Sequence, residues 1–166
     1  MIRPLGKPGD LGWALMAHAT EFSKSYGRTM SYEAFIARII ADYAANDDPG
    51  RHAAWIAELD EERVGCVLCT PSAARTTALM QLLLVTSNAE RRGIGGSLID
   101  ACVNYARAAG YARLELWSDS RLTAAAHLFR RAGFELIAEE PAPEFGPHVT
   151  GQRWALTLQA SPAQPA

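Results

Sequence analysis

Residues 79–97 read LMQLLLVTSNAERRGIGGS, and this stretch decides the fold. Its first seven residues are nearly all apolar, which is typical of a short strand that is buried on both faces. A polar loop and a cluster of glycines follow. From Ile94 onward, apolar side chains recur at helical spacing through Leu98 and Cys102, and Gly110 closes the helix. The stretch therefore predicts a buried strand, a glycine-rich turn and an amphipathic helix.

The glycine-rich turn has the features of a binding site for phosphate groups. Glycines have no side chains, so backbone N–H groups can approach a ligand closely. The helix that follows adds unpaired N–H groups and the positive end of its dipole. Arg91 and Arg92 stand beside the turn and add positive charge. The alternative is that the glycines only permit a tight connection between strand and helix.

Three phosphate-binding motifs compete for this turn. A P-loop is excluded because no Gly-Lys-Ser or Gly-Lys-Thr occurs in the chain. A dinucleotide-binding fingerprint lacks its third small residue, since Leu98 stands there. Asp119, near the end of the next strand, keeps an oxidoreductase open as a weak alternative. The remaining candidate is the pyrophosphate-binding turn of an enzyme that uses an acyl-coenzyme A.

Outward from this stretch, turn residues and hydrophobic periodicity divide the chain into short strands and helices. We expect strands at residues 1–5, 53–59, 63–70, 114–117, 134–138 and 153–158, and further helices at residues 10–24, 31–43 and 120–132. Asp10 is expected to cap the first of these helices, and Asp119 or Ser120 the last. Residues 1–160 then form one α/β domain, and residues 161–166, rich in proline and small residues, form a disordered tail.

Composition and charge limit the partners and the compartment. The chain has 166 residues, the length of one domain, and a formal net charge of −2. This charge gives no overall attraction to nucleic acid or membrane, and no apolar run is long enough to span a bilayer. Asp10 abuts the apolar stretch near the N-terminus, and Gly12 and Trp13 interrupt it, which argues against a secretory signal. We therefore expect a cytoplasmic protein.

The three cysteines are expected to be free and buried. Cys66 and Cys69 have the C-x-x-C spacing of redox and metal sites, but they lie in a predicted strand. Positions three apart on a strand point to opposite faces, so the two sulfurs cannot share a ligand. With Cys102 the count is odd, which suits a reducing compartment. The sequence predicts no metal site.

The chain resembles the GNAT superfamily of N-acetyltransferases. Their signature Q/R-x-x-G-x-G/A aligns with residues 90–95, and the family pattern Leu-Tyr-x-x-x-Gly-Phe aligns with residues 128–134. The order and lengths of the predicted elements also fit. The likeness is closest to GNAT domains associated with MarR-type regulators, and the stretches that carry it are residues 9–13, 82–85, 106–111, 116–117, 145–146 and 151–154.

This resemblance implies a single-domain mixed sheet of about six to seven strands flanked by about four helices. It implies direct transfer of an acetyl group from acetyl-CoA, bound between two splayed strands, to the amino group of a small molecule or a protein. A homodimer is common among similar proteins. The cofactor-binding residues that the resemblance assigns are Leu84, Val85, Arg91, Arg92, Gly93, Ile94, Gly95, Gly96, Ser97 and Phe129.

Two residues depart from the family pattern. Glu90 stands where the family has Gln or Arg, and it would repel a pyrophosphate if it pointed inward. Phe129 replaces the Tyr that is often assigned as the acid for the leaving thiolate, and a phenyl ring cannot donate a proton. A general acid typically contributes 10²–10⁴-fold, so its loss should slow transfer rather than abolish it. The two departures also leave open a non-catalytic module that senses an acyl-CoA.

The catalytic base cannot be assigned from the sequence. Asp119 could accept a proton at the end of its strand, although an Asp there is also a common helix cap. His148, in the last loop, could line the acceptor pocket, and so could Tyr26 and Trp117. Gln81 is either a pocket residue or a polar group that needs a partner. His18 and His127 are interpreted as structural or exposed.

Overall fold

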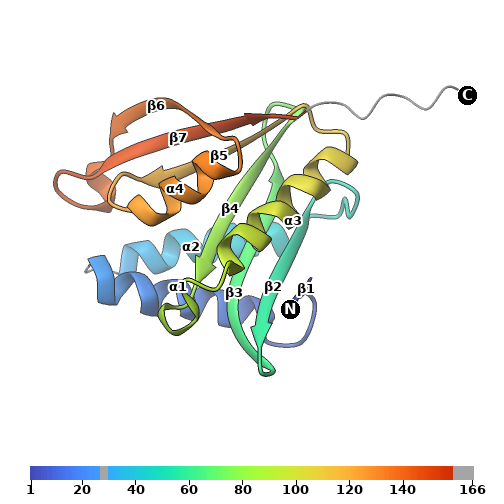
Figure 1. Ribbon diagram of the computed structural model, residues 1–166, viewed down its shortest axis with the longest axis horizontal. Helices are drawn as coiled ribbons and strands as arrows, with labels where there is room; N and C mark the ends of the chain where they lie inside the picture. Colours follow the sequence, from blue (N-terminus) through green and yellow to red (C-terminus); the bar gives the residue numbers. More distant parts are fainter. Residues whose placement is uncertain (27–29, 159–166) are drawn as a thin grey trace, which may run out of the picture.

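The computed structural model describes residues 1–26 and 30–158, without the side chains of residues 25 and 26. Figure 1 shows the elements in their spatial arrangement. In chain order they are β1 (Ile2–Pro4), α1 (Asp10–Tyr26), α2 (Met30–Ala44), β2 (Ala53–Leu59), β3 (Glu62–Pro71), β4 (Thr77–Val85), η1 (Ser87–Ala89), α3 (Ile94–Ala108), β5 (Arg113–Asp119), α4 (Thr123–Arg131), β6 (Glu135–Pro141), η2 (Pro143–Phe145) and β7 (Thr150–Thr157). The predicted tail, residues 161–166, lies outside the described residues.

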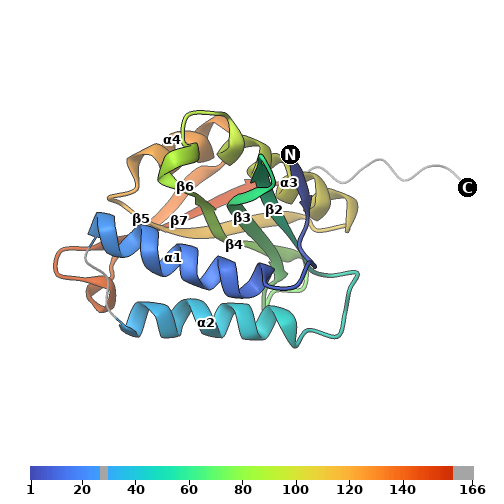
Figure 2. The ribbon, with the colours of Figure 1, turned by 90° about the horizontal axis from the view of Figure 1, so that it is seen from below.

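The strands form one mixed sheet between two layers of helices. The strand order is β1-β2-β3-β4-β5-β7-β6, with β4 and β5 parallel and the other neighbours antiparallel. Helices α1 and α2 cover one face and α3 and α4 the other (Figure 2). The single-domain α/β fold with seven strands and four helices over the described residues confirms the predicted fold class.

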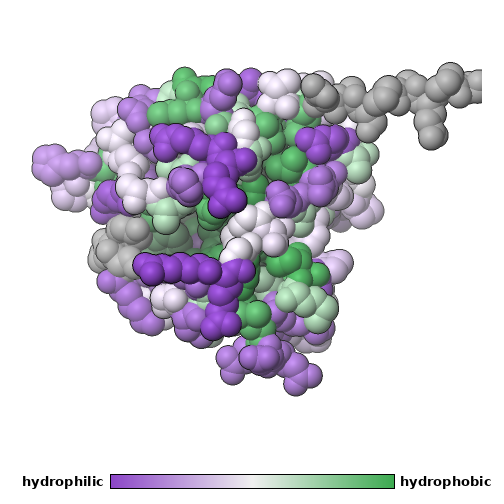
Figure 3. All heavy atoms as spheres, in the orientation of Figure 1, coloured by the Kyte–Doolittle hydropathy of each residue, from purple (hydrophilic) through white to green (hydrophobic). Residues whose placement is uncertain are grey.

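Each face of the sheet has its own apolar core. Leu98 and Cys102 of α3 pack in one core, and Ala14 and Ile36 of α1 and α2 pack in the other. Alternation along β3 sends Cys69 into the first core and Cys66 into the second. All three cysteines are free and buried, as the sequence predicts. On the face shown in Figure 3, hydrophilic side chains alternate with smaller hydrophobic patches.

Strands β4 and β5 are paired only at their beginnings. Their register runs from Thr77 opposite Arg113 to Leu79 opposite Glu115, and beyond this point the two strands have no paired residues. Leu82, with a φ of 55°, lies in an irregularity of the register between β4 and β3. Figure 1 shows the two strands diverging from their common start. The sheet is therefore open in its middle, at the carboxyl ends of two parallel strands.

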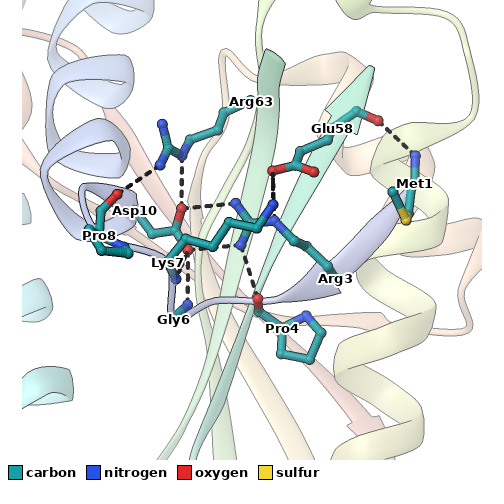
Figure 4. Close-up of polar contacts among 9 residues, drawn as sticks. All are labelled: Met1, Arg3, Pro4, Gly6, Lys7, Pro8, Asp10, Glu58 and Arg63. Atoms are coloured by element: carbon teal, nitrogen blue, oxygen red, sulfur yellow. Dashed lines mark hydrogen bonds and ion pairs between the residues drawn. The ribbon is translucent and has the colours of Figure 1, made fainter. Parts of the chain in front are cut away.

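The predicted role of Asp10 as a helix cap is wrong. Asp10 is the first residue of α1, and the Gly9 carbonyl accepts the first hydrogen bond of the helix, from the Trp13 amide. The Asp10 carboxylate instead accepts hydrogen bonds from Arg3 and Arg63 and from the amides of residues 6 and 7 (Figure 4). Two arginines outcompete the helix amides because charged donors bind a carboxylate more strongly.

The predicted cap of α4 is also wrong. The helix begins at Thr123, and Leu122 occupies the cap position without a side-chain hydrogen bond. Asp119 ends β5, and its carboxylate accepts from the amide and the guanidinium of Arg121. Three residues separate Asp119 from the helix, so its side chain is used by the turn that leaves the strand.

None of the helices among the described residues is long and apolar enough to cross a membrane.

Candidate active site

The turn between β4 and α3 presents backbone amides that no other group in the described part of the chain uses. Arg91 and Gly93 have φ angles of 62° and 76°, so the backbone is left-handed on both sides of residue 92. The first hydrogen bond of α3 runs from the Ser97 amide to the Gly93 carbonyl. The amides of residues 93–96 precede this bond and have no partner among the described residues. They point out of a helix N-terminus, where anions are favoured.

The three glycine positions of the turn differ in whether the structure requires a glycine there. Gly93 needs its positive φ, which strains any residue with a side chain. A Cβ atom on Gly95 would lie 2.8 Å from Cδ1 of Leu128, so this glycine lets α3 approach α4. A Cβ atom on Gly96 would meet nothing within 4 Å. Only Gly96 lacks a packing or backbone reason within the chain itself.

The charged side chains around the turn lie in solvent. Arg91, Arg92 and Glu90 are all exposed, so Glu90 is not held against the free amides. The Ser97 hydroxyl donates to the Gly93 carbonyl, 3.1 Å away, and closes the first turn of the helix. Net positive charge and free N–H groups therefore meet at this end of α3.

A cavity of about 540 Å³ lies where β4 and β5 separate. Its walls come from α1, α2, α4, η2 and the two diverging strands. Of the predicted site residues, Trp117, Asp119 and Phe129 line it. The residues of the turn, together with Leu84, Val85 and His148, do not. Gly95, whose Cβ position is 3.8 Å from Val85, places the turn next to the end of β4.

Three of the residues predicted to bind the acceptor, Asp119, His148 and Tyr26, have different surroundings. Asp119 is 2% exposed and is ion-paired with Arg121, 2.7 Å from its Nη2. The Asp119 carboxylate accepts hydrogen bonds from the amide and the guanidinium of Arg121. His148 is exposed, with a φ of 65°, in the loop before β7. The side chain of Tyr26 lies outside the described residues.

Phe129 contributes an apolar wall. Its ring is 4% exposed and packs against Trp154 and Phe134, with centroids 5.7 Å and 6.2 Å away. It lines the cavity from α4, on the same helix as Leu128, which contacts the Gly95 position. The cavity and the turn therefore meet the same helix.

The sequence interpretation missed His18 as a cavity residue. His18 is buried on α1, its ring stacks on Phe22 at 5.8 Å, and its Nδ1 lies 2.8 Å from the Ala14 carbonyl. Burial lowers the pKa of His18 to about 4, so the ring is neutral at pH 7. With Nδ1–H donating to Ala14, Nε2 carries the lone pair. The helical spacing of His18 and Phe22 indicates the inward face, but not that a cavity lies there.

Gln81 is both a cavity residue and a polar group with a hydrogen-bond partner, the two alternatives given by the sequence. Its Oε1 accepts a hydrogen bond of 2.8 Å from the Thr70 hydroxyl of the neighbouring strand, and its side chain also lines the cavity. The acceptor capacity of the amide is partly used by Thr70, and its NH₂ group remains a donor.

Comparison with known proteins identifies the fold family. The model of the acetyltransferase (GNAT) family matches residues 13–134, which is most of the chain. The chain belongs to the GNAT family of acetyltransferases. No curated protein matches the sequence significantly. The match to the family model confirms, at the level of the family, the resemblance based on residues 90–95 and 128–134.

Solved structures share the whole GNAT fold at low identity. The ribosomal-protein-alanine N-acetyltransferase of Brucella melitensis is 19% identical, with a TM-score of 0.76, over 95% of this chain and 99% of that one. The ribosomal-protein-S18-alanine N-acetyltransferase of Escherichia coli is 16% identical, with a TM-score of 0.72, over 100% and 99%. An aminoglycoside 6'-N-acetyltransferase complexed with coenzyme A is 15% identical, with a TM-score of 0.72, over 98% and 99%. At this identity the likeness concerns the fold.

Proposed function

We propose that this GNAT protein transfers an acetyl group from acetyl-CoA to the amino group of a small molecule or a protein. The observation that carries the proposal is the set of free amides at residues 93–96, which lies beside the opening between β4 and β5. Family membership supports it, as does the solved relative that was complexed with coenzyme A.

In this proposal the cofactor lies along the opening between β4 and β5, with its diphosphate at the glycine-rich turn and its thioester at the cavity. Residues 91–97 surround the diphosphate, which accepts hydrogen bonds from the free main-chain N–H groups of residues 93–96, and Arg91 and Arg92 add charge. The backbone of Leu84 and Val85 holds the pantetheine arm, because the β5 side of β4 has no strand partner there. The thioester then reaches the cavity beside Phe129.

The transfer itself needs few protein groups. The lone pair of the neutral amine forms a bond to the acetyl carbon, and the C–S bond breaks. The nitrogen gives up one proton and the coenzyme A thiolate takes up one, so the products are an amide and free coenzyme A. A main-chain N–H of β4 polarises the thioester carbonyl. Thiols have a pKa of roughly 8.5, so the thiolate leaves without a strong acid. The ion-paired Asp119 is not part of this proposal.

Replacing Gly96 by Ala tests the site of the diphosphate. A methyl group there meets no protein atom, so the fold should be kept. In this proposal the added methyl group crowds the diphosphate bound at the neighbouring amides. We expect acetyl-CoA to raise the unfolding free energy of the wild type by about 2.7 kcal/mol at a hundredfold excess over its Kd. Gly96→Ala should lose most of this increment, as measured by thermal unfolding with and without acetyl-CoA.

Gly12→Ala is the matched control. Gly12 is also a helical glycine whose Cβ position is open, and it lies in α1, away from the turn. Its variant should respond to acetyl-CoA like the wild type. Absence of any acetyl-CoA effect on the wild type would reject the proposed function.

An acyl-CoA sensor remains the second candidate function, because Phe129 cannot act as an acid. Phe129→Tyr places a hydroxyl at the cavity wall beside the proposed thioester. If the protein is an enzyme that lacks its acid, release of coenzyme A with an accepted amine should accelerate by roughly tenfold or more. A sensor would bind acetyl-CoA and stay at background with both side chains.

Four further predictions belong with this proposal. They are the domain limits of residues 1–160, the particular likeness to GNAT domains of MarR-type regulators, a homodimer and a cytoplasmic location. Three free, buried thiols support a reducing compartment. Light scattering of the purified chain tests the dimer.

A further inference from the structure

The cavity wall combines aliphatic side chains with aromatic side chains that come from distant parts of the chain. Phe35 of α2 contacts Phe145 of η2, with ring centroids 5.3 Å apart, and Phe145 contacts Trp117 of β5 at 4.9 Å. All three line the cavity, and Phe35 and Trp117 are about 40% exposed. Large aromatic side chains that stay open toward a cavity offer faces for another ring to stack on.

Trp117 is held in place by a glycine on the neighbouring strand. Asp119 pairs with Gly151 in the register of β5 and β7, and a Cβ atom on Gly151 would lie 2.6 Å from the indole Nε1 of Trp117. The indole therefore rests directly on the backbone of β7. This contact fixes one aromatic wall, so the cavity presents a preformed apolar surface.

The charge of the cavity is small. Asp119 is neutralised by Arg121, and His18 is neutral because burial lowers its pKa to about 4. Glu144, an exposed residue at the rim, is the one cavity carboxylate of the described chain without an ion pair. A polyamine or an aminoglycoside carries several positive charges, which one carboxylate cannot balance.

We propose that the acceptor is a monoamine with an aromatic body, whose ring binds among Phe35, Trp117 and Phe145. The inference rests on the proposed function and adds the substrate class. The amino group lies toward the opening between β4 and β5, where the thioester is proposed to arrive. Its nitrogen forms the bond to the acetyl carbon, the C–S bond breaks, and the products are a neutral aryl-alkyl acetamide and coenzyme A.

A panel of amines tests the substrate class. Phenethylamine, tyramine and tryptamine are compared with spermidine, kanamycin and a peptide with an N-terminal alanine, with coenzyme A release as the readout. We expect kcat/KM for the aromatic monoamines to exceed that for the other acceptors by about tenfold or more. Preferred acetylation of spermidine, kanamycin or the peptide would overturn the inference and leave the proposed function intact.

Phe35→Ala tests the aromatic wall, with Met16→Ala as its control. Met16 is a large, exposed apolar residue of α1 that does not line the cavity. Phe35→Ala should raise KM for tryptamine by about tenfold and leave the Kd of acetyl-CoA unchanged, because the acceptor loses one stacking face together with its buried area. Met16→Ala should change neither value. An equal loss for tryptamine in both variants would contradict the role of Phe35.

Binding separates the two proposals if no amine reacts. Tryptamine and N-acetyltryptamine are titrated into the protein saturated with coenzyme A, and calorimetry records the heat. Binding that is weakened in Phe35→Ala but not in Met16→Ala supports the aromatic site even without turnover. Binding of coenzyme A without binding of either indole overturns the inference, whereas failure to bind coenzyme A at all rejects the proposed function.

Discussion

At the scale of the residue, His18 makes the stability of the fold depend on pH. Its folded-state pKa, about 4, lies below the unfolded value of 6.5, so the unfolded chain takes up the proton first. Stability is therefore full above the unfolded value and falls as the pH decreases toward 4. Between pH 7.5 and 5 we expect a loss of about 2 kcal/mol, measured by urea unfolding at each pH. His18→Asn, which keeps a side-chain donor, should remove most of this slope.

Asp10 does not obscure this pH window. Hydrogen bonds from Arg3, together with those from Arg63 and the nearby amides, hold the pKa of Asp10 well below its usual range. Its stabilising contribution is present above the unfolded value of 3.8 and is lost only as the pH falls below that value. A stability that stays flat between pH 7.5 and 5 would mean that His18 binds its proton in the folded state.

At the scale of the element, an ion-pair network ties four segments together: the buried Asp10 carboxylate binds Arg3 and Arg63, and Arg3 also binds Glu58. Arg3 comes from β1, Arg63 from β3 and Glu58 from β2, and Asp10 begins α1 (Figure 4). Asp10→Ala leaves two arginines without this partner, so we expect a loss of about 3 kcal/mol in the free energy of unfolding. Denaturant titration measures the change.

Lys7→Ala is the control for that network. The Lys7 side chain is 60% exposed, and its ammonium lies 3.4 Å from the Glu58 carboxylate. An exposed ion pair of this kind is worth less than about 1 kcal/mol. Losses of the same size in the two variants would show that Asp10 is no more important than a surface charge.

At the scale of the whole molecule, both cores shield their thiols. Burial raises the pKa of Cys66 to about 12, and a hydrogen bond with Cys69 together with burial raises that of Cys102. We expect none of the three thiols to react with a disulfide reagent at pH 8 in the folded protein, and all three to react in denaturant. Rapid labelling of one thiol in the native state would locate a part of the core that opens locally.

Local sequence patterns predicted most of the helices and strands. Competition between hydrogen-bond donors from distant segments decided which groups the side chains bind. The strand period correctly sent Cys66 and Cys69 to opposite faces, because alternation depends only on neighbouring residues. The predictions of helix caps were wrong because the helix amides compete with every other nearby donor for the carboxylate. For Asp10 that donor is Arg63, which is 53 residues away in the chain.

The sequence by itself determined the succession of strand, glycine turn and helix, and through residues 90–95 and 128–134 it determined the family. These features depend on residues that are close in the chain. Only the tertiary structure decided that His18, Phe35, Trp117 and Phe145 line one cavity, because they come from four elements that meet where β4 and β5 part. A periodic pattern shows which side of a helix faces inward, whereas the packing of distant segments decides whether that side meets a core or an open space.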